Sequence, residues 1–216
     1  MNESIIDFIY YTNFYEDSGL YSKEEISECL LQKKSKQSKK EIETLNLFLG
    51  VKFILENSGE NLIDPVIIDE LNKIIVGSEC SYMRNQTKTN VTFIGSSPWD
   101  QTEQHLQYIC DLYQRKLKES VNKIDLGAWF FWMFLFIHPF KDGNGRTARV
   151  LMCHHFNKVF PLITPNLLRE EYICIFSERK ILDLNDFAHQ NPPGRIKKMI
   201  KYSLLPRKVA KKKRKD

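Results

Sequence analysis

Residues 138–149 read His-Pro-Phe-Lys-Asp-Gly-Asn-Gly-Arg-Thr-Ala-Arg. The preceding segment, 125–137, is rich in apolar and aromatic side chains, which predicts a buried helix. Pro139 lacks an amide hydrogen and disfavours helical backbone at the residue before it, so this helix should end at the start of the stretch. Helical spacing resumes at Arg146. The stretch is therefore predicted to be a loop between two helices.

The loop holds side chains suited to proton transfer and to phosphate binding. His138 lies at its mouth, where an imidazole can take a proton near neutral pH. Asp142 offers a hard oxygen ligand of the kind that Mg²⁺ uses together with substrate phosphates. Gly143 and Gly145 flank Asn144, and this trio permits positive φ and a close approach of backbone to a ligand. We therefore expect a base, a metal ligand and a phosphate-binding turn within one loop.

The helix after the loop is expected to complete an anion site. Its first turn offers unpaired amide hydrogens and the positive end of the helix dipole to a phosphate. Arg146 and Arg149 are three positions apart and share one helix face, where two guanidinium groups can clamp a polyphosphate. The alternative is a simple turn followed by solvated arginines, but such a turn needs neither the histidine nor the aspartate.

The stretch resembles the signature of the Fic family, His-Pro-Phe-x-Asp/Glu-Gly-Asn-Gly-Arg-x-x-Arg, and fills all nine specified positions. Fic proteins are mostly helical enzymes that move AMP from ATP onto a hydroxyl side chain of another protein. The resemblance implies that His138 deprotonates the target hydroxyl and that Asp142 holds Mg²⁺. It assigns nucleotide binding to five further residues: Gly143, Asn144, Gly145, Arg146 and Arg149.

Related chemistries stay open beside transfer of AMP. Doc-type relatives phosphorylate their targets and have an altered Gly-Arg pair, whereas Gly145 and Arg146 are intact here, which favours nucleotidyl transfer. The alternatives are a transferase that uses another donor such as UTP, a transferase that moves a phosphoryl group, and a non-catalytic binding module. The resemblance implies a hydroxyl-bearing target protein, and it leaves self-modification and a homodimer open.

One β-rich segment interrupts the helical pattern. Residues 87–94 favour a strand, and they resemble the flap with which the family lines its target segment by main-chain pairing. The flap residues by this resemblance are Val91, Thr92, Phe93 and Ile94. The expected fold class is therefore all-α, a mainly helical Fic fold, with a small β-hairpin flap.

The N-terminal region resembles a built-in inhibitor of the family. Residues 12–17 match the motif Ser/Thr-x-x-x-Glu-Gly/Asn except at the last position, which is Asp17. The resemblance implies that Glu16 pairs with Arg149, removes the guanidinium from the γ-phosphate and inhibits transfer. In some relatives the same glutamate aligns a water that removes AMP from the target. The competing candidate is Glu56, which lacks the Ser/Thr four positions earlier.

Composition bounds the rest of the chain. Its 216 residues can bury one core, and the net charge of +5 is concentrated in 206–216, which carries seven Lys and Arg against one Asp. A near-neutral body argues against an extended nucleic-acid surface, so nucleic acid is expected to bind only weakly, through this tail. The tail resembles a nuclear-import signal, and the alternative is a solvated, disordered charge run.

The remaining signals indicate an intracellular protein, cytoplasmic or nuclear. Five cysteines without a Cys-x-x-Cys pair fit reduced thiols, and no signal peptide is recognisable. The apolar run 128–137 is far shorter than the ~18 residues that span a bilayer, so no membrane association is expected. The expected organisation is an inhibitory helix region with a basic linker in 1–40, a Fic catalytic domain in 41–205 and the tail.

Overall fold

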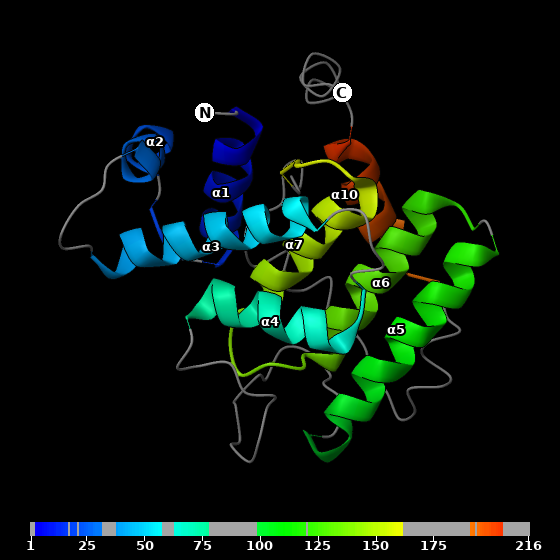
Figure 1. Ribbon diagram of the computed structural model, residues 1–216. Helices are drawn as coiled ribbons and strands as arrows, with labels where there is room; N and C mark the ends of the chain where they lie inside the picture. Colours follow the sequence, from blue (N-terminus) through cyan, green and yellow to red (C-terminus); the bar gives the residue numbers. More distant parts are fainter. Residues whose placement is uncertain are drawn as a thin grey trace.

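The computed structural model describes residues 3–16, 18–20, 22–31, 38–57, 63–77, 99–119, 121–161, 191–192 and 194–204, and over these it is helical (Figure 1). The helices are α1 (Glu3–Glu16), α2 (Lys23–Leu31), α3 (Lys39–Glu56), α4 (Pro65–Val76), the short 3₁₀ turn η1 (Trp99–Gln101), α5 (Thr102–Lys118), α6 (Lys123–Ile137), α7 (Asn144–Phe156) and α10 (Gly194–Ser203). This part contains no β-strand, which agrees with the all-α class, and the predicted flap residues lie outside it.

Helix α6 is the centre of the core. Its N-cap Asn122 accepts hydrogen bonds from the amides of Ile124 and Asp125 at 2.9 and 3.2 Å. Every side chain from Leu126 to Ile137 is buried, and α5, α7 and α10 pack around the helix (Figure 1). Each large side chain buried in this way contributes about 1.5–3 kcal/mol. The apolar segment that precedes the signature is therefore the helix on which the signature loop is built.

Helices α3 and α4 form a pair that packs against α7. Ser38 and Glu41 make a capping box at the start of α3. Asp64 caps α4, and Pro65 lies in its first turn, where the missing amide hydrogen costs nothing. At Gly50 of α3 a Cβ atom would lie 2.7 Å from Ile75 Cγ1, so the absence of a side chain lets the two helices approach closely.

Helices α1 and α2 pack on each other and on α3. The fully buried carboxylate of Asp7 in α1 pairs with Lys23 of α2 at 2.5 Å. A buried carboxylate is costly unless it is paired, so this contact fixes α2 onto α1. Ser22 and Glu25 form a reciprocal cap before α2, which the structure describes as far as Leu31.

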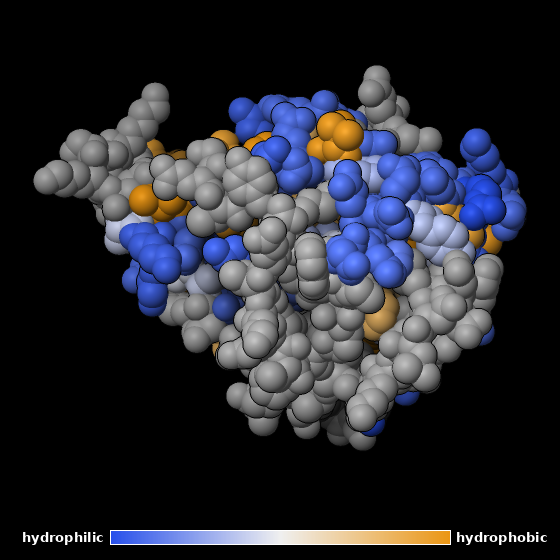
Figure 2. Space-filling view, turned by 90° about the horizontal axis from the view of Figure 1, so that it is seen from below, coloured by the Kyte–Doolittle hydropathy of each residue, from blue (hydrophilic) through white to orange (hydrophobic). Residues whose placement is uncertain are grey.

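The apolar surface of the described part is dispersed. On the face shown in Figure 2, hydrophobic residues form separate small areas between hydrophilic side chains. The exposed large hydrophobic residues come from several helices, and they include Phe14, Leu31, Ile42, Leu49 and Val66. Single exposed apolar side chains are normal in a globular protein and need no special role.

Candidate active site

The signature loop begins where α6 ends. His138 follows the last residue of the helix and has left-handed backbone angles, φ 51° and ψ 58°. Its amide still donates to the carbonyl of Phe134 at 3.0 Å, so the chain leaves the helix directly after this bond. The prediction that the helix stops before Pro139 is confirmed, and the partly exposed imidazole lies at the beginning of the loop.

The side chain of Asn144 closes the loop. Its Oδ1 accepts from the amide of Phe140 at 2.9 Å, and its Nδ2 donates to the carbonyl of Phe140 at 2.7 Å. Asn144 is buried and Phe140 packs into the core, so these two hydrogen bonds tie the loop to the protein interior. Nucleotide binding by Asn144 stays a prediction, but its amide group has a positioning role that the signature did not predict.

Gly143 occupies a position that only glycine fits. Its φ is 76°, and a Cβ atom there would lie 2.4 Å from Val76 Cγ2 of α4. Left-handed backbone already disfavours other residues, and the contact with α4 leaves no space for a side chain. The Gly143 carbonyl accepts from the amide of Thr147 at 2.8 Å, which starts α7 directly after the turn.

Asp142 and Arg146 form an ion pair at the edge of the site. The Asp142 Oδ2 atom accepts from Arg146 Nη2 at 3.0 Å, and its Oδ1 accepts from the Gly143 amide at 2.6 Å. The Asp142 side chain is 64% exposed, whereas that of Arg146 is 7% exposed. The buried arginine therefore holds the carboxylate in place. The oxygens of the carboxylate still face solvent, where a hard cation can approach.

Glu16 lies directly against the first turn of α7. Its carboxylate forms an ion pair with Arg149, whose side chain is only 1% exposed. A Cβ atom on Gly145 would lie 2.1 Å from Glu16 Oε1, so the carboxylate rests on the bare glycine surface. The ring of Tyr15 covers the same guanidinium, with its centroid 5.6 Å from Arg149 Cζ. An anionic group is thus bound at the helix N-terminus by an arginine, as the dipole favours.

The end of α1 is anchored to α3 by polar contacts. Asn13 Nδ2 donates to the carbonyl of Leu20 at 2.9 Å and to Thr44 Oγ1 at 3.3 Å. Thr44 Oγ1 also accepts from the Leu20 amide at 3.0 Å, and Glu43 accepts from the amide of Gly19 at 2.9 Å. These bonds hold residues 19 and 20 against α1 and α3. Sequence analysis missed Thr44 because nothing local marks it.

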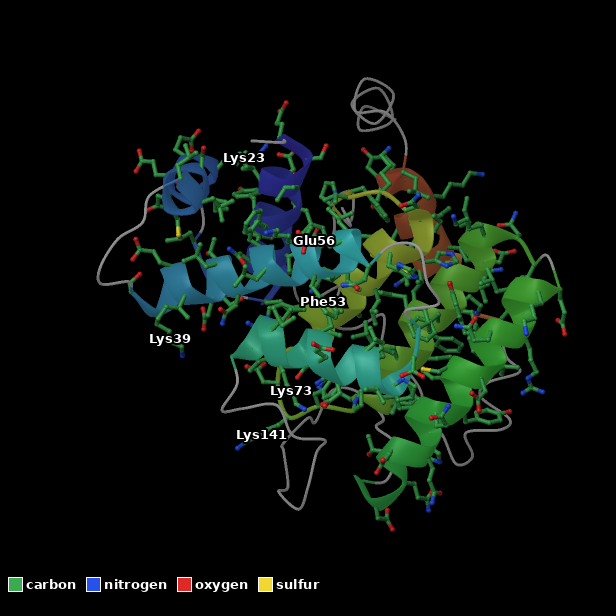
Figure 3. The ribbon with its side chains drawn as sticks, in the orientation of Figure 1. Lys23, Lys39, Phe53, Glu56, Lys73 and Lys141 are labelled. Atoms are coloured by element: carbon green, nitrogen blue, oxygen red, sulfur yellow. The ribbon has the colours of Figure 1, made fainter. Side chains whose placement is uncertain are left out.

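The competing glutamate is not part of the site. Glu56, at the C-terminal end of α3, pairs with Lys52 of the same helix at 3.4 Å and is 62% exposed (Figure 3). Lys141, the first of the three unspecified positions of the signature, is exposed and points away from the helices in Figure 3. Of the two candidate glutamates, the structure brings only Glu16 to Arg149.

A buried polar chain supports the helices behind the site. The hydroxyl oxygen of Tyr113 in α5 lies 2.7 Å from His155 Nδ1, and His155 Nε2 lies 2.7 Å from the carbonyl oxygen of Lys123. The carbonyl requires a proton on Nε2, so the neutral imidazole accepts the Tyr113 hydroxyl proton at Nδ1. Burial lowers the pKa of His155 to about 4 and raises the pKa of Tyr113 to about 12. His155 is thus a neutral structural group. Separately, the described residues contain no group of three or more His, Cys, Asp or Glu side chains that could hold a metal ion.

The depressed pKa of His155 predicts a loss of stability in acid. In the folded protein its pKa is about 4, against an ordinary value of 6.5, so only the unfolded chain takes up this proton between these pH values. The contribution of the neutral His155 imidazole to the free energy of unfolding is therefore complete above pH 6.5. It is lost as the pH falls towards 4, by up to about 3 kcal/mol. Urea unfolding of the parent and of His155→Gln should show the difference in unfolding free energy shrinking over this range. A constant difference would contradict the assignment.

Comparison with known proteins shows which sequences and folds this chain resembles. The sequence model described as the Fic/DOC family matches residues 62–156. Over 151 residues, or 65% of the chain, it is 26% identical to protein adenylyltransferase fic-1 of Caenorhabditis elegans. It is 38% identical over 97 residues, 41% of the chain, to a protein of Ostreid herpesvirus 1 (isolate France) named ribonucleoside-diphosphate reductase small chain. The matches span only 28% of the nematode protein and 16% of the viral protein.

Solved structures show the same fold. The structure of Fic-1 from C. elegans has a TM-score of 0.73 at 21% identity and covers 100% of this chain and 66% of its own. A Fic-domain signaling protein from Bacteroides thetaiotaomicron has a TM-score of 0.69 at 19% identity and covers 96% and 87% of the two chains. The molecule therefore has the all-α Fic fold. Its segment 62–156 is a domain of the Fic/DOC family, distantly homologous to protein adenylyltransferases.

Some predictions fall outside the described residues. The flap residues Val91, Thr92, Phe93 and Ile94 and the basic tail 206–216 are not among them, so both stay predictions. None of the helices in the described part has both the length and the hydropathy to cross a membrane.

Proposed function

We propose that this chain is a protein adenylyltransferase that moves AMP from ATP to a serine, threonine or tyrosine hydroxyl of a target protein. The observation that carries the proposal is the placement of the Glu16 carboxylate on Gly145 and Arg149, which marks an anion site at the start of α7. The exposed Asp142 carboxylate lies in the same turn, and His138 begins the loop. A base, a carboxylate and an anion site on one loop fit transfer of a nucleotidyl group.

In this mechanism the His138 imidazole takes the proton of the target hydroxyl. The hydroxyl oxygen then attacks the α-phosphorus of ATP, a new oxygen–phosphorus bond forms, and the bond to the β-phosphate breaks to release pyrophosphate. Arg149 and the first amides of α7 bind the negative charge of the phosphates. The role of the protein is to orient the reactants and to supply a base of suitable pKa.

The residues present fit a magnesium ion. Asp142 would hold it, because this carboxylate is 64% exposed and is fixed by Arg146 from the buried side. When bound, Mg²⁺ supplies positive charge that neutralises the phosphates. A carboxylate that is already oriented loses little conformational freedom when a cation binds.

Glu16 is proposed to inhibit this activity. Its carboxylate engages Arg149 and adds negative charge at the helix N-terminus, so the phosphates of ATP compete with it for one guanidinium. The contacts of Asn13 and Thr44 keep this inhibitory end of α1 on α3. Removal of AMP from a modified target by the same site remains part of the proposal and is measured with the same variants.

Labelled nucleotides test the proposal. The parent and Glu16→Gly are incubated with candidate proteins and with ATP, GTP, CTP or UTP labelled at the α-phosphate, and with ATP labelled at the γ-phosphate. Adenylyl transfer requires protein-bound label from α-labelled ATP, and release of that label as AMP reports the reverse modification. Label from the γ-phosphate would indicate phosphoryl transfer, label from UTP alone would indicate another donor, and no label with any nucleotide would favour a binding module.

Asp142→Ala should remove the divalent-ion dependence of transfer along with most of the activity, since this carboxylate is the proposed ligand. Activity of Glu16→Gly and Glu16→Gly/Asp142→Ala is measured during a Mg²⁺ titration. Asp69→Ala is the matched control, because Asp69 is an acidic residue of α4 paired with Lys73 at 2.6 Å. An unchanged Mg²⁺ titration in the Asp142 variant would place the metal elsewhere.

A further inference from the structure

Helix α4 carries a buried amide that contacts the signature loop from outside the signature. Asn72 is 0% exposed. Its Nδ2 donates to the backbone carbonyl of Asp142 at 3.0 Å and to Thr147 Oγ1 at 3.1 Å. One amide group therefore joins the residue proposed to hold the metal to the first turn of the anion-binding helix.

The contact leaves little freedom for the loop. A Cβ atom on Gly143 would lie 2.9 Å from Asn72 Nδ2, so the amide presses against the residue between its two acceptors. Helix α4 also packs along α7, which fixes the position of Asn72 relative to the loop (Figure 1). The carbonyl of Asp142 is thereby held towards α4, while the carboxylate of the same residue is 64% exposed.

The polar side chain of Asn72 carries a free-energy cost that an apolar side chain would avoid. Its Oδ1 is buried and has no hydrogen-bond partner among the described residues. A buried oxygen without a partner is unfavourable, whereas leucine is of comparable size and would fill the space without that cost. The donor function of Nδ2 explains why an amide lies there.

We propose that Asn72 is a positioning residue that sets the orientation of the Asp142–Gly143 peptide and so aims the Asp142 carboxylate at the metal and phosphate site. This inference rests on the proposed function for its metal and nucleotide part, but the restraint on the loop does not depend on it. Asn72 does not touch the reacting groups and acts through Asp142 and Thr147.

Two variants of Asn72 and one matched control test the proposal in the full Glu16→Gly chain. Asn72→Leu removes the donor and the unpartnered oxygen together, so the loss of a donor is separated from a loss of core volume. Asn72→Asp keeps the shape and replaces the donor by an acceptor facing the Asp142 carbonyl. Leu71→Ala is the control, because Leu71 is buried on the same helix and packs towards Gly50 on α3.

Two measurements follow each variant: amide hydrogen exchange of the peptide that contains residues 138–149, and the Mg²⁺ concentration for half-maximal transfer. We expect both Asn72 variants to speed exchange in this peptide by about tenfold, the effect of losing about 1.4 kcal/mol of local restraint, and to raise the Mg²⁺ requirement similarly. Leu71→Ala should speed exchange across the whole chain without a specific effect on the loop.

The outcomes separate this inference from the proposed function. Exchange in the loop that accelerates no more than in Leu71→Ala would overturn it, and so would an unchanged Mg²⁺ requirement in active Asn72→Leu. Faster exchange in the loop, combined with a parent that transfers no label from any nucleotide, would remove the proposed function and support Asn72 as the restraint on the loop.

Discussion

Replacing His138 by alanine in the Glu16→Gly background should lower transfer by about 10²- to 10⁴-fold, because the target hydroxyl then has no base. Nucleotide affinity should change little, since His138 lies at the end of α6 and the anion site lies at the start of α7. Label incorporation and equilibrium nucleotide binding are measured on the same preparation. His154→Ala, a histidine on α7 that is outside the loop, serves as the matched control.

The separation of rate from affinity is the critical part of this result. A variant that loses binding and transfer together would indicate a collapsed loop, and thermal unfolding would detect it. Transfer at the parent rate in a folded His138→Ala protein would reject His138 as the base.

Replacing Glu16 by glycine should raise transfer by about 10- to 100-fold, the range expected when a charge-assisted bond worth about 1.5–3 kcal/mol is no longer competing for Arg149. The gain should be lost in the double variant Glu16→Gly/Arg149→Ala, because Arg149 is the group that the carboxylate holds. Transfer and ATP affinity are measured for the parent, both single variants and the double variant, which together form a double-mutant cycle.

Two further variants make this test decisive. Glu56→Gly is the matched control, because Glu56 is exposed and pairs with Lys52 instead of Arg149. Arg149 is almost fully buried, so Arg149→Lys is included in case the alanine variant does not fold. Activation by Glu56→Gly and not by Glu16→Gly would transfer the inhibitory role to the other glutamate.

The sequence predicted the loop well because its determinants are local. Pro139 stops α6, Gly143 permits the left-handed turn, and the apolar run before the loop becomes the buried centre of the core. Local residues also mark the starts of two helices, with Ser22 as a cap and Pro65 in a first turn. Each of these signals acts within a few residues of the feature that it predicts.

The supporting contacts could not be predicted because their partners are distant in sequence. Asn72 bonds to Thr147 across 75 positions, and Asn13 bonds to Thr44 across 31. Neither pair has a local pattern that distinguishes it from an ordinary polar residue on a helix. The signature also hid the second role of Asn144, because the bonds of its side chain to Phe140 depend on how the loop folds back.

Helix α10 was missed for a different reason. Its apolar residues Ile196, Met199 and Ile200 recur at three and four positions and are buried, so a periodic signal was present. It lies in a short basic segment close to the tail, and its basic residues resemble those of the solvated tail more than those of a core helix. Packing against α6 stabilises it, as tertiary contacts do for most short amphipathic helices.

The left-handed backbone at His138 lowers the stability of the folded protein in return for a side chain that can act as a base. A residue with a Cβ is disfavoured by about 1–2 kcal/mol in this conformation, whereas glycine adopts it without that strain. Selection for thermal endurance alone would therefore favour glycine at this position and would remove the proposed base. The presence of histidine in a backbone geometry suited to glycine is the pattern expected when a residue is retained for what its side chain does.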